Sequence, residues 1–246
     1  MNQTVVALAG NPNVGKSTLF NALTGLRQHT GNWPGKTVDR AQGSFSYREK
    51  SFLLVDLPGT YSLMAHSAEE EIARDFICFG RPDVILAVLD GTALERSLNL
   101  ALQIMEVASS VVVCVNLMDE AAKKGVSIDI SALAAELGVP VIPAAARSKH
   151  GLEEIKKALY ATGVLGHTAK PKQIRYAAEI EELIRRILPR LADLKSEPYF
   201  NQRWLALRLL DSPPAFIAKI GHYIHLQNTP TSSLRKADNA HEYSWE

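Results

Sequence analysis

A glycine-rich loop near the amino terminus carries the residues with the clearest chemistry. It fits the pattern G-x-x-x-x-G-K-[ST], in which the glycines let consecutive backbone N–H groups point toward an anion. Its residues are Gly10, Asn11, Pro12, Asn13, Val14, Gly15, Lys16 and Ser17. An apolar run at 5–9 precedes the loop and a helical pattern begins at Ser17, so the dipole of the helix start also favours an anion. The spacing predicts a cradle for the phosphates of a nucleotide.

Three side chains at the end of this loop have distinct predicted roles. Lys16 can place its ammonium between the β- and γ-phosphates, and Ser17 can ligate Mg²⁺ through its hydroxyl oxygen. Thr18 is placed to hydrogen-bond to the α-phosphate. The alternative is a chance glycine-rich turn, against which the flanking strand and helix patterns count.

A carboxylate further along the chain is placed to complete a magnesium site. Asp56 begins an Asp-Leu-Pro-Gly sequence that directly follows the apolar run at 51–55. It would orient a magnesium-bound water, and Gly59 would bring its N–H to the γ-phosphate. An Asp-x-x-Gly sequence alone is a common turn, but this one follows a predicted buried strand downstream of the phosphate loop.

Residues 31–38 lie between these two motifs and have the Gly/Pro-rich composition typical of a mobile loop. We expect the hydroxyl and carbonyl of Thr37 to coordinate Mg²⁺ and the γ-phosphate only in the triphosphate state, so that hydrolysis releases the loop. Gly35 and Lys36 would lie beside the nucleotide. The alternative is a solvated loop threonine.

A third motif, residues 116–119, follows the apolar run at 111–115 and has the chemistry to select guanine. An ionised Asp119 only accepts hydrogen bonds, so it can pair with the N1–H and the N2 amine of guanine but not with adenine. Asn116 would bridge the base edge to the phosphate loop, and Met118 would lie at the base. The alternative is a helix N-cap at Asn116.

A further guanine-binding element is expected after the next strand, where Ala144, Ala145 and Ala146 stand. The N–H of Ala146 can donate to guanine O6. A serine is usual at the place of Ala145. Because the backbone makes the contact, we expect weaker hydrogen bonding within the loop, modest affinity and easy nucleotide release.

Apolar runs that alternate with helical patterns predict an α/β protein to hold these motifs. Strands are predicted at 5–9, 51–55, 84–89, 111–115 and 139–142, and helices at 17–23, 69–79, 94–107, 130–137 and 152–160. Residues 43–47 turn at Arg48 and Glu49 into the next strand, which predicts a hairpin. We expect a P-loop GTPase fold of the Ras-like kind, with a mostly parallel sheet, helices on both faces and one antiparallel edge strand.

A second, smaller all-α domain is predicted after a linker marked by Gly163, Gly166 and Pro171. We place the GTPase domain at 1–165 and the helical domain at 166–246. Apolar stripes indicate three helices, the first running from about Ile174 to an end at Pro189. The other two centre on 204–210 and 216–224, and residues 228–246 are left unassigned because they show little periodicity.

Composition excludes several other classes of protein. The 246 residues carry 27 Lys and Arg against 26 Asp and Glu, and no long run of like charge, so nucleic acid is not an expected partner. Cys78 and Cys114 lie in apolar surroundings without metal-ligand spacing, which suits a reducing compartment. No stretch approaches the roughly 18 apolar residues of a membrane span, and no secretion signal is visible, so we expect a soluble piece.

Together these motifs resemble the cytosolic N-terminal region of the ferrous iron transport protein B (FeoB) family over essentially the whole length. The most specific pieces are residues 10–13, 32–38, 56–63 and 90–98. The resemblance implies a GTPase domain, a helical domain and then a polytopic membrane region that carries Fe²⁺, which is absent here. It places the chain at the cytoplasmic face of the bacterial inner membrane and leaves a homo-oligomer open.

The resemblance also implies slow hydrolysis that potassium stimulates. Many regulatory GTPases have a glutamine after Asp-x-x-Gly to orient the attacking water, whereas this chain has Thr60. In the family, the residue equivalent to Asn13 helps to hold K⁺ near the phosphates, where the cation supplies charge otherwise given by an arginine finger. Asn13, Lys16, Thr37 and Gly59 form the expected catalytic set, with GTP or GDP, Mg²⁺ and K⁺ bound.

Two other functions stay open at this point. The phosphate loop resembles that of ribosome- or RNA-associated GTPases, although the tail has no basic face. A GTP-dependent binding module with negligible hydrolysis is also consistent with Thr60 and Ala145. His222 and His225 have the spacing of two metal ligands on one helix face, but no third ligand is evident, so solvated or structural histidines are expected.

Overall fold

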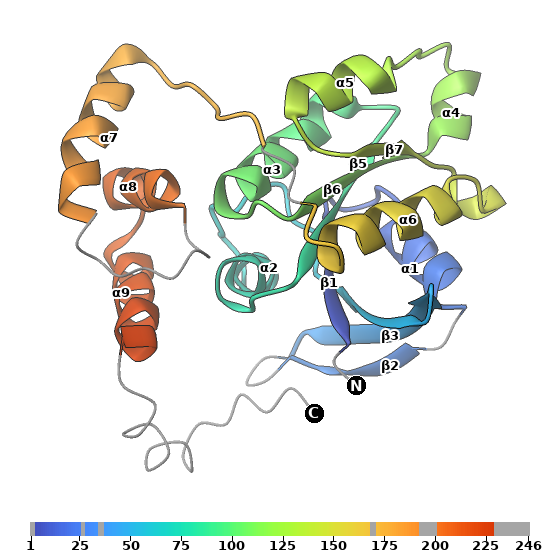
Figure 1. Ribbon diagram of the computed structural model, residues 1–246, viewed down its shortest axis with the longest axis horizontal. Helices are drawn as coiled ribbons and strands as arrows, with labels where there is room; N and C mark the ends of the chain where they lie inside the picture. Colours follow the sequence, from blue (N-terminus) through green and yellow to red (C-terminus); the bar gives the residue numbers. More distant parts are fainter. Residues whose placement is uncertain (1–2, 26–27, 34–36, 168–170, 192–200, 229–246) are drawn as a thin grey trace. The chain divides into compact units, whose positions relative to one another are not determined.

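The chain folds into two compact units, residues 1–174 and 175–246. The computed structural model describes residues 3–25, 28–33, 37–167, 171–191 and 201–228. The first unit is a sheet covered by helices and the second is all-helical, which confirms the predicted fold class (Figure 1). The proposed domain boundary at 165/166 stays a prediction.

One seven-stranded sheet forms the centre of the first unit, in the order β2-β3-β4-β1-β5-β6-β7. The strands are β1 Thr4–Gly10, β2 Gln28–Asn32, β3 Asp39–Tyr47, β4 Lys50–Asp56, β5 Val84–Asp90, β6 Val111–Asn116 and β7 Val141–Pro143. The predicted antiparallel strand is β3, which pairs antiparallel with β4. The edge strand is β2, which the sequence analysis did not anticipate because it lacks an apolar alternation.

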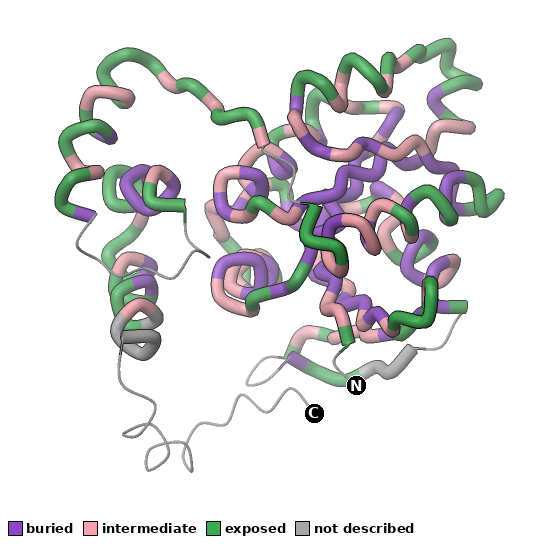
Figure 2. Tube along the Cα trace, in the orientation of Figure 1, coloured by how far each residue is buried: buried purple, intermediate pink, exposed green. Residues whose placement is uncertain are grey.

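Helices cover both faces of this sheet (Figure 1). They are α1 Lys16–Thr24, α2 Ala68–Phe79, α3 Leu94–Val107, α4 Met118–Lys123, α5 Ile130–Leu137 and α6 Leu152–Gly163. Val6 and Leu8 of β1 pack in one cluster with α1 and α6, whereas Ala7 and Ala9 point to the opposite face. Burial on both faces explains why the strands read as continuous apolar runs (Figure 2). The short, polar helix α4 has no apolar period and was not predicted.

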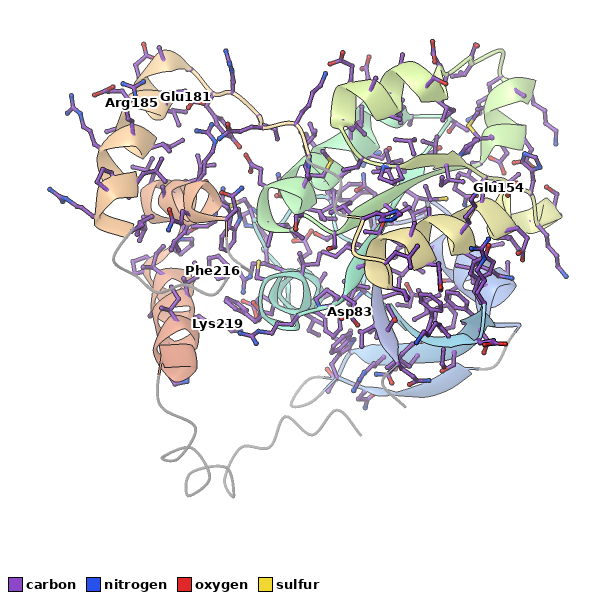
Figure 3. All side chains as sticks on the ribbon, in the orientation of Figure 1. Asp83, Glu154, Glu181, Arg185, Phe216 and Lys219 are labelled. Carbon is purple, nitrogen blue, oxygen red and sulfur yellow. The ribbon has the colours of Figure 1, made fainter. Side chains whose placement is uncertain are left out.

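The neighbouring parallel strands β1 and β5 are joined at their amino ends as well as along their length. Asp83, labelled in Figure 3, precedes β5, and its carboxylate accepts a hydrogen bond from the N–H of Val5 at 2.7 Å. Its own N–H donates to the Val5 carbonyl at 3.0 Å. The loops at the opposite, carboxyl ends of β1 and β5 therefore extend from strands that are fixed to each other at their amino ends.

The second unit contains α7 Ala178–Leu191, α8 Gln202–Asp211 and α9 Pro214–Asn228. The prediction that the first of these helices runs from Ile174 and ends at Pro189 is wrong, since it begins at Ala178 and continues to Leu191. Proline costs a helix one N–H hydrogen bond, and here only the last turn is affected, while Leu191 beyond it is buried.

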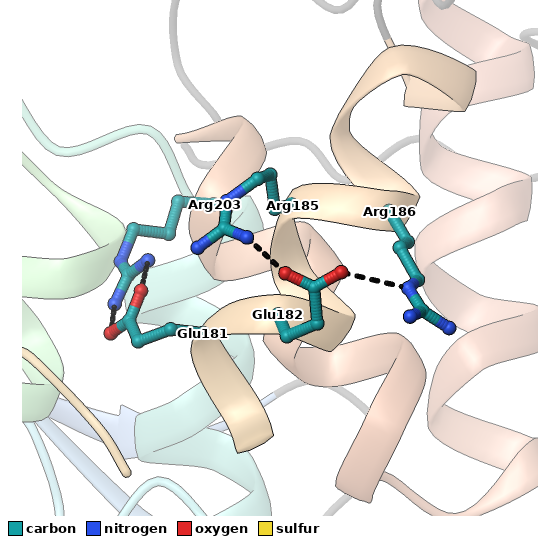
Figure 4. A network of polar contacts seen from close by, with 5 residues as sticks. All are labelled: Glu181, Glu182, Arg185, Arg186 and Arg203. Carbon is teal, nitrogen blue, oxygen red and sulfur yellow. Dashed lines mark hydrogen bonds and ion pairs between the residues drawn. The ribbon is translucent and has the colours of Figure 1, made fainter. Parts of the chain in front are cut away.

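An ion-pair network joins α7 to α8 (Figure 4). Arg203 donates to both carboxylate oxygens of Glu181, at 2.7 and 2.5 Å, and this contact lowers the pKa of Glu181 to about 2. Glu182 pairs with Arg185 and Arg186 on its own helix. None of the helices that the structure describes is long and apolar enough to cross a membrane.

Candidate nucleotide-binding site

The backbone of the phosphate loop turns sharply from β1 into α1. Asn13 and Gly15 both have left-handed backbone conformations, with φ of 65° and 81°. A Cβ on Gly15 would lie 2.5 Å from Nδ2 of Asn116, and one on Gly10 would lie 2.7 Å from the carbonyl oxygen of Val88. No side chain caps the first turn of α1, so its N–H groups face the loop without a side-chain acceptor. This geometry suits an anion.

An open cavity of about 600 Å³ lies beside this loop. It brings together Lys16 and Ser17 with Asp56 and Gly59, as the sequence predicted for residues 40 positions apart. The lining residues are Lys16, Ser17, Gly31, Asn32, Asp39, Arg40, Ala41, Asp56, Leu57, Pro58 and Gly59. Asn13 in the loop and Thr18 in the first turn of α1 are exposed, whereas Asn11 and Val14 are buried.

The electrostatics of this cavity are set by burial. Desolvation lowers the pKa of Lys16 and raises the pKa of Asp56, and the attraction between the two charges partly offsets both shifts. Oδ1 of Asp56 is buried and has no hydrogen-bond partner among the described residues. This carboxylate oxygen and the hydroxyl of Ser17, which lines the same cavity, are oxygen ligands of the kind that a hard cation such as Mg²⁺ prefers.

The predicted switch segment is only partly within the described residues. Thr37 is exposed and is not among the described residues that line the cavity, and Gly35 and Lys36 lie outside the described residues. Two of the residues that line it from this side, Asp39 and Arg40, were not predicted. Their only signal in the sequence is a charged pair directly after the Gly/Pro-rich stretch, which is too common to identify a site.

Trp33 anchors the start of this segment. It is buried, and its backbone N–H donates to the Val38 carbonyl at 2.9 Å. Its ring meets Phe76 of α2 edge-on at 5.5 Å, and the Arg40 guanidinium lies 5.3 Å from the ring centre. Trp33 is therefore packed against α2, the helix that follows the Asp56 segment.

Thr60, which stands where many GTPases have glutamine, has its side chain engaged within the protein. Its hydroxyl donates to the Ser62 carbonyl at 2.6 Å and lies 3.3 Å from Oε1 of Glu70, and the residue is 1% exposed. Its N–H donates to the Gly10 carbonyl at 3.3 Å. The Thr60 side chain therefore does not replace the glutamine in orienting water.

Asn116 organises the base side of the site. Its Nδ2 donates to the Val14 carbonyl at 3.0 Å, and its Oδ1 accepts from the Ala146 N–H at 3.1 Å, both buried. The alternative, a helix N-cap at Asn116, is wrong, because α4 is preceded by Leu117 in that position and has no side-chain cap. Asn116 thus joins the phosphate loop to the alanine loop, whereas its contact with a base stays a prediction.

The alanine loop is closed by its own hydrogen bonds. Ala145 and His150 exchange two backbone bonds at 3.2 Å, and the Ser148 hydroxyl donates to the Ala145 carbonyl at 3.1 Å. The N–H of Met118 donates to the Ala144 carbonyl at 3.1 Å, which places the half-buried Asp119 next to this loop in the first turn of α4.

The cysteines and histidines add no second site within the described part of the chain. Cys78 and Cys114 are buried, and burial raises the pKa of Cys114 to about 12. His222 is exposed, and the side chain of His225 lies outside the described residues. No group of three His, Cys, Asp or Glu side chains in the described residues could hold a metal ion.

The sheet order, the phosphate loop and the guanine-type motif define the first unit as a P-loop G domain. Residues 4–159 match the family described as "Ferrous iron transport protein B", and residues 176–244 match "FeoB cytosolic helical domain". The chain belongs to the ferrous iron transport protein B (FeoB) family.

Similar proteins agree with this assignment. The "Fe(2+) transporter FeoB" of Methanocaldococcus jannaschii is 49% identical over 86% of this chain, and that of Salmonella typhimurium is 39% identical over 97%. The chain spans only 31% and 30% of those two relatives. The cytosolic domain of T. maritima FeoB in GDP form I matches with a TM-score of 0.82 and 36% identity, over 94% of this chain and 87% of that one. Its GMPPNP form matches equally well, with 37% identity over 93% and 87%.

Proposed function

We propose that this chain binds guanine nucleotide and hydrolyses GTP to GDP and phosphate. The observation that carries the proposal is the cavity in which Lys16, Ser17, Asp56 and Gly59 meet, although they come from two separate segments of the chain. Structures of the T. maritima relative described as GDP and GMPPNP forms support the same assignment. Phosphate groups would enter the cavity beside the amino end of α1.

Guanine would be read on the opposite side of the phosphate loop. Asp119 would accept from N1–H and the N2 amine, with Met118 and Ala144 beside the ring. The Ala146 N–H, predicted to donate to O6, already donates to Asn116, so O6 would share that N–H in a bifurcated bond. This sharing supports the modest affinity expected from the sequence.

Two cations are part of the proposal. Ser17, Thr37 and Asp56 would hold Mg²⁺, the last through a water. The Oδ1 of Asp56, which is buried and has no hydrogen-bond partner within the described residues, supports this assignment. When bound, the ion offsets the negative charge of the phosphates. Asn13, exposed on the loop, would present its amide oxygen to K⁺. The K⁺ ion would supply charge otherwise given by an arginine side chain.

The chain's own groups then position the reacting phosphate. Lys16 neutralises charge on the β- and γ-phosphate oxygens, and the Gly59 N–H donates to the γ-phosphate. Gly59 lies so close to the phosphate loop that a Cβ on it would be 3.1 Å from Pro12. Because the Thr60 side chain is engaged elsewhere, the backbone and the bound cations have to orient the water, and hydrolysis is slow.

Single-turnover hydrolysis in matched KCl and NaCl buffers tests the enzymatic part of the proposal. We expect GTP cleavage to be faster in KCl, and Asn13→Ala to remove that difference while GDP binding persists. Equal rates in both salts, or an Asn13→Ala variant that still responds to K⁺, would contradict the potassium role. Binding without any cleavage would identify a GTP-dependent binding module instead.

Base selection is tested by the substitution Asp119→Asn. The amide can donate to the C2 carbonyl of xanthine, so the variant should lose GTP binding and gain xanthosine triphosphate binding. Titration with fluorescent nucleotides measures both affinities. A variant that keeps its preference for GTP would refute the role of Asp119.

We further propose that the nucleotide state regulates ferrous iron transport by a membrane region that continues beyond this chain, at the cytoplasmic face of the inner membrane. The names of the relatives, which are about three times as long, support this. Iron uptake by the full-length protein with Lys16→Ala tests the coupling. Uptake equal to that of the unmodified full-length protein, at equal expression, would contradict it.

A further inference from the structure

The segment between β5 and the second turn of α3, residues 90–97, is closely bonded to the site but has no role in the proposed chemistry. Oδ1 of Asp90 accepts from the Thr92 N–H at 2.8 Å, and the buried Ser97 hydroxyl accepts from the Asp90 N–H at 3.1 Å. The Gly91 N–H donates to the Asn116 carbonyl at 2.9 Å. The segment is therefore a rigid turn fixed to the base side of the site.

Its far end contacts both parts of the phosphate side. The Arg96 carbonyl accepts from Nδ2 of Asn11 at 3.3 Å, and Asn11, in the phosphate loop, is 3% exposed. The Arg96 guanidinium lies over the ring of Tyr61, 4.5 Å from its centre. Tyr61 is 42% exposed, so this cation–π contact covers one face of a ring that the core does not bury.

Tyr61 continues the segment that faces the phosphates. Gly59, two residues before it, lies against Pro12, and the Thr60 N–H donates to the Gly10 carbonyl at 3.3 Å. Without a glutamine in this segment, the placement of its backbone decides how well the γ-phosphate and the water are aligned. Arg96 contacts the phosphate loop through its carbonyl and this segment through its side chain, so it links the two parts that have to stay aligned.

We propose that Arg96 is a positioning residue for GTP hydrolysis, which holds residues 59–61 against the phosphate loop through its stacking on Tyr61. The inference rests on the proposed GTPase function. It predicts a specific pattern, because side-chain substitutions at position 96 keep the carbonyl that binds Asn11 and remove only the stacking. Nucleotide affinity should then be preserved while the rate of the chemical step falls.

The test compares Arg96→Ala, Arg96→Lys, Tyr61→Ala and Tyr61→Phe in this chain. Single-turnover GTP cleavage in KCl should fall about two- to fivefold in Arg96→Ala and Tyr61→Ala, the size expected for an exposed cation–π contact. GDP affinity should stay within about twofold. Tyr61→Phe keeps the ring and should match the unmodified chain, and Arg96→Lys should lie between the two because it keeps the charge but not the planar stack.

The double variant Arg96→Ala/Tyr61→Ala separates positioning from general damage, because two residues that act through one contact give no further loss when both are removed. Additive losses, an unchanged rate in Arg96→Ala, or rate and GDP affinity falling together would overturn the inference. If the unmodified chain binds GTP but does not cleave it, the GTPase proposal fails first and this inference with it. If the unmodified chain cleaves GTP and Arg96→Ala does so equally well, only this inference fails.

Discussion

The base side and the phosphate side of the site differ in how far the protein satisfies their polar groups. On the base side, the Asn116 amide makes one buried hydrogen bond to Val14 and another to Ala146. On the phosphate side, Asp56 has a buried oxygen with no hydrogen-bond partner in the described part of the chain. Desolvation lowers the pKa of Lys16 and raises the pKa of Asp56, which favours the neutral form of each. The protein organises the base side by itself, whereas the phosphate side is arranged for charges that a ligand supplies.

This difference has an energetic meaning. A buried hydrogen bond within the protein stabilises the fold whether or not a ligand is bound, whereas an unpaired buried charge lowers stability until a partner arrives. Substitutions on the base side should therefore change the stability of the free protein. Substitutions on the phosphate side should change ligand binding and leave the free protein as stable as before, or more so.

The largest effect is expected from Asn116→Ala. It leaves the Val14 carbonyl and the Ala146 N–H buried without their partner, which costs about 2 to 4 kcal/mol of unfolding free energy. Urea denaturation without nucleotide measures the loss, with the exposed Asn99→Ala as the matched control. A free protein as stable as the control would show that the base side is not held by Asn116.

In contrast to Asn116→Ala, the substitution Lys16→Ala should lower nucleotide affinity without lowering the stability of the free protein. We expect GDP and GTP affinity to fall about 30- to 100-fold, as for the loss of a hydrogen-bonded charge worth about 2 to 3 kcal/mol. The stability of the free protein should not fall, because burial already disfavours the lysine charge. Isothermal titration and denaturation together measure both, and Lys157→Ala, an exposed lysine on α6, is the control. A large loss of free-protein stability would remove the contrast with Asn116.

Ala145→Ser should strengthen hydrogen bonding on the base side of the site and slow nucleotide release. A serine hydroxyl here can hydrogen-bond within the loop, and we expect GDP dissociation to slow about fivefold, which corresponds to roughly 1 kcal/mol. Ser148→Ala removes the hydroxyl bond to the Ala145 carbonyl and should speed release. Stopped-flow displacement of a fluorescent GDP gives both rates, and no change in Ala145→Ser would refute the prediction.

The smallest effect is expected for Asp56→Asn without nucleotide or Mg²⁺. Burial raises the pKa of Asp56, so the folded state holds that proton more tightly than the unfolded state does. The stability that this tighter proton binding gives the folded state is therefore fully present at low pH. It is lost as the pH rises above the ordinary pKa of an aspartate and through the raised pKa of Asp56. At pH 7 the neutral asparagine should raise the unfolding free energy by about 1 kcal/mol or less. Denaturation at pH 4 and pH 7 checks this, and a destabilised variant at pH 7 would contradict it.

Much of the fold could be predicted because strands buried on both faces leave continuous apolar runs. Helices such as Leu94–Val107 and Ile130–Leu137 were predicted with their observed bounds. The polar strand β2 and the six-residue helix α4 carry no such pattern, since β2 is formed by pairing with β3 rather than by apolar burial that can be read from its sequence. The predicted helix end at Pro189 is wrong for a related reason. Local propensity favours a helix end at proline, but it does not include the packing of Leu191, which is buried in the last turn of α7.

The sequence by itself determined which chemical groups are present and the backbone that presents them. Glycine at position 15 permits the left-handed turn, and each of the three motifs stands at the carboxyl end of a parallel strand, β1, β4 or β6. Only the tertiary structure decided which groups are paired. Asn116 binds the Ala146 N–H as well as the phosphate loop that its motif predicts, Thr60 turns its hydroxyl toward Ser62, and Arg96 covers Tyr61. Such pairings depend on how separate strands and helices pack, and the spacing of residues along the chain does not encode that packing.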